Sequence, residues 1–168
     1  MWIWKGDDSP NNFVMNLDNQ LSEITVSYHP HRPVSDRYII RDSTSAYKYI
    51  IKTWNPHTLF LYEEFKTLFL DRKNVVIGYR NLGVGNSAGV VVDIRQMFAI
   101  ALKVGACGII LAHNHPSGQM RPSKADLHLT EKIDQGAKTL DLKLLDHLII
   151  GDDTYYSFQD EGNIEISP

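Results

Sequence analysis

The residues best suited to chemistry lie between His113 and Asp126, where two imidazoles, a hydroxyl and a carboxylate follow an apolar run. That run, residues 107–112, is too short for an independent helix and predicts a buried strand. Side chains two residues apart in an extended chain point to the same face. His113 and His115 can therefore present both rings to one point, as a metal chelate does, while Asn114 points away.

A third ligand is expected from the helix that follows. Residues 123–140 have helical spacing, with an apolar stripe formed by Leu129, Ile133 and Ala137. Asp126 lies three residues before Leu129 and so falls on the same inward-facing stripe. Burying a carboxylate is costly unless a cation or donor meets it. Two histidines and one carboxylate, with water in the fourth position, form the open arrangement of catalytic zinc, which acidifies that water.

Each fragment also has an ordinary structural interpretation. Pairs of histidines occur by chance on surfaces, and Ser123-x-x-Asp126 alone is a good helix capping box. Their combination directly after a predicted buried strand favours the metal site. His29 and His31 have the same spacing but lack a preceding buried strand and a matching carboxylate, so they predict an exposed loop.

The pattern His113-x-His115-Pro116, six residues, then Ser123-x-x-Asp126 resembles the signature of the JAB/MPN (JAMM) metalloprotease fold. His-Asn-His-Pro-Ser-Gly followed by Pro-Ser-x-Ala-Asp resembles its RadC branch in particular. The resemblance implies one Zn²⁺ ion held by His113, His115 and Asp126, and an oxyanion stabilised by Ser123. It also implies an upstream glutamate as general acid and base, and peptide or isopeptide bonds as substrates.

In the RadC proteins that this chain resembles, the catalytic glutamate precedes an apolar strand that ends in Asp ahead of a turn. Counting back from Asp71 selects Glu63. Glu64 is the adjacent alternative, and strand alternation places the two on opposite faces, so only one can reach the metal site. Either could instead be an exposed carboxylate at the start of a strand.

Two polar residues, Asp146 and His147, interrupt the apolar run 143–150. The sequence Leu-Asp-His-Leu-Ile-Ile around them again resembles RadC proteins. One interpretation is a buried, hydrogen-bonded structural role. The other is support of the zinc ligands by hydrogen bonds to the side of each ligand that faces away from the metal.

The whole pattern predicts an α/β (mixed α+β) fold, with a single domain over residues 21–168 and an irregular arm over residues 1–20. The resemblance implies a cytidine-deaminase-like mixed sheet flanked by helices. Strands are expected over residues 21–28, 61–70, 75–79, 107–112, 143–150 and 155–158. Helices are expected over 43–54 with a hydroxyl cap, from Asp93 to Gly105, and from Ser123, with a turn over 71–74 and a flexible loop over 81–89.

Composition narrows the classes of protein. The 168 residues are 43% hydrophobic and 22% charged, which is typical of a globular domain, and the net charge of -3 gives no electrostatic case for binding nucleic acid. Cys107 is the only cysteine, which excludes an internal disulfide framework and fits a reducing compartment. No apolar run approaches membrane-spanning length, and the first residues lack a signal-peptide core. A cytoplasmic protein is expected, with its oligomeric state left open.

Longer RadC proteins carry an N-terminal helix-hairpin-helix region associated with DNA binding, for which this sequence has neither the length nor a basic stretch. The favoured interpretation is a zinc-dependent hydrolase with a peptide or protein substrate. A metal-dependent nuclease could use the same acidified water, although such sites often hold two metals and more carboxylates. A binding module, such as a DNA-repair accessory protein, would need no catalytic glutamate.

Overall fold

The computed structural model describes residues 28, 38–87 and 89–164 of the chain. The predicted arm over residues 1–20, nearly all of the strand predicted over 21–28 and the loop with His29 and His31 lie outside these residues. In chain order the elements are α1 Ser43–Ile50, the short 3-10 helix η2 Ile51–Thr53, β1 Glu64–Leu70, β2 Val76–Val84, α2 Ile94–Lys103, β3 Gly108–Asn114, α3 Lys124–Thr139, β4 Lys143–Ile150 and β5 Tyr155–Ser157.

Five strands form one mixed sheet in the order β2-β1-β3-β4-β5. Strand β1 is antiparallel to both β2 and β3, and β5 is antiparallel to β4 at the sheet edge. Strands β3 and β4 are parallel, and α3 makes the crossover that a parallel pair requires. The register places Phe65 opposite His113, and Leu111 opposite His147. The predicted α/β fold with a mixed sheet flanked by helices is confirmed.

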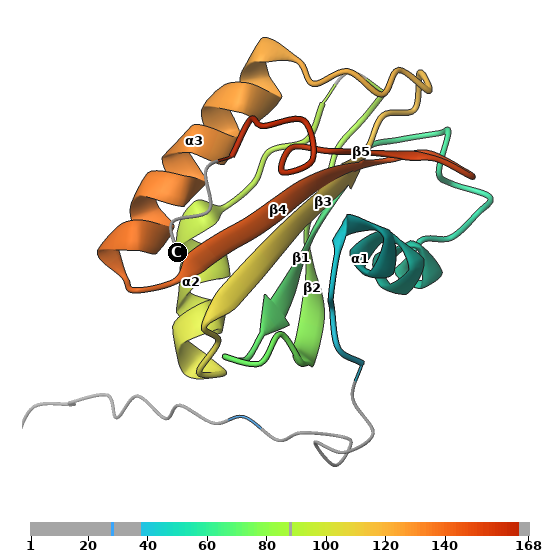
Figure 1. Cartoon of the computed structure of the whole chain (residues 1–168). Coiled ribbons are helices and arrows are strands. Elements are labelled where there is room, and N and C mark those ends of the chain that lie inside the picture. The colour runs from blue at the N-terminus through green and yellow to red at the C-terminus, as the bar shows by residue number, and fades with distance from the viewer. Residues whose placement is uncertain (1–27, 29–37, 88, 165–168) are drawn as a thin grey trace, which may run out of the picture.

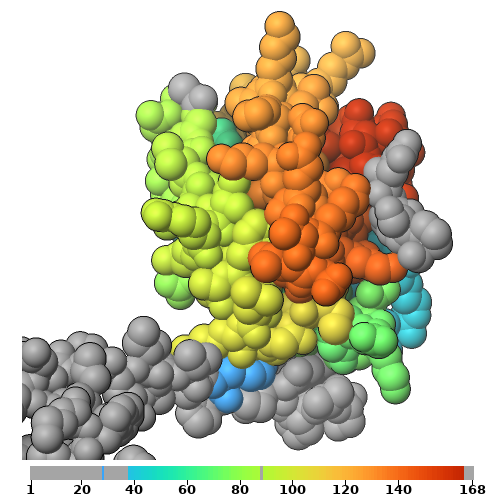
Figure 2. Space-filling view, turned by 90° about the vertical axis from the view of Figure 1, so that its left-hand side faces the viewer, coloured from blue at the N-terminus to red at the C-terminus, as the bar shows by residue number. Residues whose placement is uncertain are grey.

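Helices cover both faces of this sheet, with α2 and α3 on one side and α1 on the other (Figure 1). Alternation along β3 divides its side chains between two cores. Ile109 and Leu111 pack with residues of α2 and α3, whereas Ile110 and Ala112 pack with residues of α1. His113 continues the first series, so the strand itself directs its ring towards the α3 side. Figure 2 views this side, where α2 and α3 lie next to each other.

Local sequence explains how α2 begins and ends and how α3 begins. The Asp93 carboxylate caps α2 by accepting hydrogen bonds from the amides of Arg95 and Gln96. Gly105, with φ at 66°, follows the end of that helix in the left-handed conformation that favours glycine. A reciprocal capping box joins Ser123 to Asp126 at the start of α3.

The first helix and the first strand differ from the prediction. The cap of α1 is the Asp42 carboxylate, which accepts from the Ser45 amide, and not the predicted hydroxyl. Strand β1 begins at Glu64 and not at residue 61, because residues 55–61 form turns closed by bonds from Thr58 N to Asn55 O and from Leu61 N to Thr58 O. Glu63 therefore lies just ahead of the strand.

The prediction of a loop over residues 81–89 is wrong for the first half of that range. Strand β2 continues to Val84 because β1 keeps pairing with it, and the ladder absorbs an irregularity between Phe65 and Lys66. The turn over 71–74 and the strands β4 and β5 agree with prediction, β5 to within one residue. In the described part of the chain, no helix is long and apolar enough to cross a membrane.

Candidate metal centre

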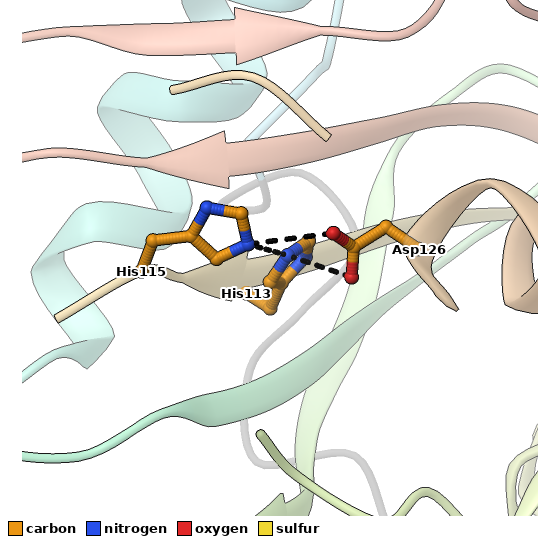
Figure 3. A group of neighbouring side chains, drawn as sticks. All are labelled: His113, His115 and Asp126. Atoms are coloured by element: carbon orange, nitrogen blue, oxygen red, sulfur yellow. Dashed lines mark hydrogen bonds and ion pairs between the residues drawn. The ribbon is translucent and has the colours of Figure 1, made fainter. Parts of the chain in front are cut away.

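Three side chains from two neighbouring segments converge on one point (Figure 3). His113 belongs to the end of β3, His115 follows it, and Asp126 lies in the first turn of α3. His113 Nε2 lies 2.9 Å from His115 Nε2 and 3.3 Å from Asp126 Oδ1. His115 Nε2 lies 3.4 Å from Asp126 Oδ2. The structure thus brings together the three residues that the sequence selects as metal ligands, and this group could bind a metal ion.

The geometry of the group fits a small cation. Ligand atoms about 2.0–2.1 Å from a tetrahedral ion are roughly 3.3 Å apart, which matches two of the three separations. His115 Nδ1 donates to the Gln119 carbonyl at 2.6 Å, because a carbonyl oxygen can only accept. In the neutral ring, Nε2 then carries a lone pair that faces the other two ligands. Nitrogen and carboxylate donors of this kind suit a divalent transition metal.

Electrostatics make the point of convergence attractive to a cation. Burial would raise the pKa of Asp126, but hydrogen bonds with His113 and His115 outweigh it and hold the pKa of this carboxyl far below its ordinary range. The same contact with Asp126 raises the pKa of His115 against the opposing effect of burial. Because a metal binds the deprotonated forms of these ligands, metal binding at this point competes with protons.

The two adjacent glutamates lie on opposite sides of the sheet. Glu63 lines the same cleft as His115, Ser123 and Asp126. Burial raises the pKa of Glu63, opposed by His113 and His115 and assisted by the Asp126 charge. Glu64 instead lies on the α1 side, where Oε2 accepts from Asn81 Nδ2 at 2.8 Å and lies 3.2 Å from Lys66 Nζ. Of the pair, Glu63 is the carboxylate in the cleft.

This cleft has a volume of about 500 Å³ and lies between the segment after β2 and the start of α3. Ser123 lines it while also capping α3: its Oγ accepts from the Asp126 amide at 3.2 Å, and its own amide donates to Asp126 Oδ2 at 2.7 Å. Among the described residues, no acceptor takes the Ser123 hydroxyl hydrogen. The side chain can therefore act as a cap and still donate to a group bound in the cleft.

Asn114, which the sequence places away from the metal, holds the segment that carries Glu63. Its Oδ1 accepts from Trp54 Nε1 at 3.0 Å and from the Glu64 amide at 2.8 Å. Its Nδ2 donates to the carbonyls of Leu59 at 2.7 Å and Tyr62 at 2.9 Å. All four hydrogen-bonding positions of this fully buried amide are thus used. Only its position between the two histidines could have drawn attention to it in the sequence.

Asp146 and His147 point to opposite faces of β4. His147 is fully buried, with Nε2 2.8 Å from His113 Nδ1 and Nδ1 2.6 Å from Thr130 Oγ1. Burial holds the pKa of His147 well below its ordinary value, so the ring is neutral. Asp146 contacts none of the three candidate ligands, and its carboxylate instead accepts hydrogen bonds from Ser157 Oγ, Gln159 N and His147 N. Of these two residues, only His147 touches a candidate metal ligand.

The sequence patterns do not single out Thr130. It lies one helical turn after Asp126 on the inward face of α3, and its hydroxyl donates to the Asp126 carbonyl at 2.6 Å. The only signal in the sequence was a hydroxyl four residues after a predicted ligand on the buried stripe of the helix. That spacing does not reveal the partner on β4.

The RadC-like JAB domain family matches residues 40–163. The chain is 52% identical over 101 residues to a UPF0758 protein of Flavobacterium johnsoniae, a match that covers 60% of this chain and 44% of the relative. A UPF0758 protein of Porphyromonas gingivalis is 41% identical over 135 residues, covering 79% and 58%. One of Methanosarcina mazei is 41% identical over 103 residues, covering 61% and 45%. The chain spans about half the length of the curated relatives it matches. Because the family match covers most of its residues, the chain belongs to the RadC-like JAB domain family.

Proposed function

We propose that this chain is a zinc-dependent hydrolase that cleaves a peptide or isopeptide bond. The observation that supports this most is the convergence of His113, His115 and Asp126 in a cleft that also contains the Glu63 carboxylate. When bound by these three ligands, zinc would lower the pKa of a water in its open position and polarise a substrate carbonyl.

The remaining steps belong to side chains of the cleft. The Glu63 carboxylate takes a proton from the attacking water and delivers it to the leaving amine nitrogen. Burial raises the pKa of Glu63, which suits a group that must both accept and return a proton. The Ser123 hydroxyl donates to the carbonyl oxygen as negative charge develops there.

A nuclease is less well supported by the side chains present. Metal-dependent nucleases often use two ions about 3.5–4 Å apart, held by several carboxylates. Across residues 38–87 and 89–164, one group of three or more His, Cys, Asp or Glu side chains is placed to hold an ion. It consists of His113, His115 and Asp126. The net charge of -3 offers no general attraction for a phosphate backbone. Hydrolysis at one metal ion is therefore the better match.

The test compares the zinc-loaded wild type with Glu63→Gln on a mixed library of peptides and isopeptide-linked peptides, read by mass spectrometry, and on DNA in parallel. Glu131→Gln is the control, because Glu131 is an exposed glutamate of α3 outside the cleft. We expect cleavage of library members by wild type and the control. Glu63→Gln should retain zinc and lose at least about 100-fold in rate, as removal of a general base does.

Cleavage of DNA alone by the wild type would favour the nuclease. A zinc-loaded wild type that leaves every substrate intact, or a Glu63→Gln variant with the wild-type rate, would contradict the proposal.

A further inference from the structure

A chain of hydrogen bonds links two of the candidate metal ligands behind the cleft. Starting from His113 Nδ1, it passes to His147 Nε2 at 2.8 Å and from His147 Nδ1 to Thr130 Oγ1 at 2.6 Å. Thr130 Oγ1 then reaches the backbone carbonyl of Asp126 at 2.6 Å. On the cleft side, the Asp126 carboxylate lies 3.3 Å from His113 Nε2.

The direction of the bonds in this chain is worked out from its end at the Asp126 carbonyl. A carbonyl oxygen only accepts, so the single hydroxyl hydrogen of Thr130 is directed at Asp126 O. Towards His147 the hydroxyl can then only accept, which places a hydrogen on His147 Nδ1. His147 is fully buried and stacked on the Phe158 ring, with 4.6 Å between the ring centroids, and its two ring nitrogens contact His113 Nδ1 and Thr130 Oγ1. Burial among such groups favours the neutral ring, whose Nε2 must accept.

His113 is therefore the donor to His147 and carries its hydrogen on Nδ1. Its Nε2 is left with a lone pair, and this is the atom that faces His115 Nε2 and the Asp126 carboxylate. The opposite tautomer would place a hydrogen at the point where the three ligands converge.

We propose that Thr130 and His147 are positioning residues that fix the metal-binding tautomer of His113. They do so through hydrogen bonds that begin at the backbone carbonyl of Asp126. Both histidine ligands then have their tautomer set by a carbonyl. His115 is set directly by Gln119, whereas His113 is set through two side chains. Because this carbonyl belongs to Asp126, the third ligand, the same hydrogen bonds also fix the position of the start of α3 relative to the ring of His113. This inference rests on the metal site of the proposed function, but not on the reaction catalysed there.

The central test uses Thr130→Val, which keeps the shape of the side chain but removes the hydroxyl. Thr139→Val is a matched control: Thr139 makes the same bond to the carbonyl four residues earlier in α3, to Gln135 O at 3.0 Å, but on an exposed face. Thr130→Ser restores the hydroxyl. The zinc dissociation constant of each full-length variant is measured by competition with a chromophoric chelator.

We expect Thr130→Val to weaken zinc binding by about 10–100-fold, the usual effect of losing a group that orients a metal ligand. Thr130→Ser should recover most of that loss, and Thr139→Val should match the wild type. If Thr130→Val binds zinc as tightly as the wild type, the inference is overturned while the metal site stands. If the wild type binds no zinc, both the inference and the proposed function fail.

A second measurement does not depend on any variant folding. Long-range ¹H–¹⁵N NMR correlations of the histidine rings in the wild-type protein report which nitrogen carries hydrogen. The zinc-loaded protein should show hydrogen on Nδ1 of both His113 and His147. Hydrogen on Nε2 of His147 would overturn the inference whatever the zinc affinities are.

Discussion

Replacing Asn114 with leucine should destabilise the protein strongly, although the two side chains are similar in size. The amide makes four hydrogen bonds while fully buried between the two histidine ligands. In the variant, the indole N–H of Trp54, the amide of Glu64 and the carbonyls of Leu59 and Tyr62 lose their partner. Three of these groups belong to buried residues, and Tyr62 is partly exposed, so its carbonyl can find water more readily.

Each buried polar group left unpaired costs about 1–3 kcal/mol. Three such groups, offset in part by the added apolar burial of leucine, give an expected loss of about 3–5 kcal/mol in the free energy of unfolding. For a chain of this size that loss lowers Tm by roughly 6–20 °C.

Urea unfolding of Asn114→Leu, followed by far-UV circular dichroism, measures this loss. Asn55→Ala is the control, because Asn55 is exposed and its side chain accepts a local hydrogen bond from His57 N. The control should change stability by less than about 1 kcal/mol. A loss below about 1 kcal/mol for Asn114→Leu itself would refute the view that this amide holds the segment around Glu63.

Three further variants test other parts of the structure. Glu64→Gln should cost about 3–5 kcal/mol in urea unfolding, because it removes the negative charge paired with Lys66 and leaves the buried ammonium with the Thr53 carbonyl and the Trp54 ring; a neutral effect would refute this pairing. Burial raises the pKa of Asp146 to about 6 from 3.8, so the wild-type unfolding free energy should lose a contribution as pH rises from 3.8 to about 6. Asp146→Asn should remove that contribution, and parallel pH curves for the two proteins would contradict it. A Cβ on Gly85 would lie 1.9 Å from Gly89 O, so Gly85→Ala should shift the turn after β2 and lower Tm by several degrees; an unchanged Tm would show that the turn adapts.

Local periodicity was sufficient to predict the inward placement of Asp126. The helical spacing from Asp126 to Ala137 depends on neighbouring residues alone, and α3 buries both. Strand alternation likewise predicted that His113 and His115 share a face while Asn114 points away. These predictions succeeded because the interactions that decide them lie between residues close together in the sequence.

Features that depend on pairing between distant strands were harder to predict. Contact between His113 and His147 requires the parallel register of β3 and β4, which includes an irregularity between Ile109 and Ile110. Alternation placed Glu63 and Glu64 on opposite faces, but the choice between the faces depends on which one α3 covers. Gly83 and its neighbours resembled a loop, yet pairing with β1 overrides that local preference.

Metal analysis of the purified protein tests the metal centre most directly. Wild-type protein loaded with zinc and then dialysed should retain one zinc per chain, lose it to a strong chelator and regain it on addition of zinc. Asp126→Ala, treated in the same way, should retain far less, because the carboxylate that balances the charge is gone. A wild type that holds no zinc after loading, or an Asp126→Ala variant that holds it equally well, would contradict the assignment of His113, His115 and Asp126 as metal ligands.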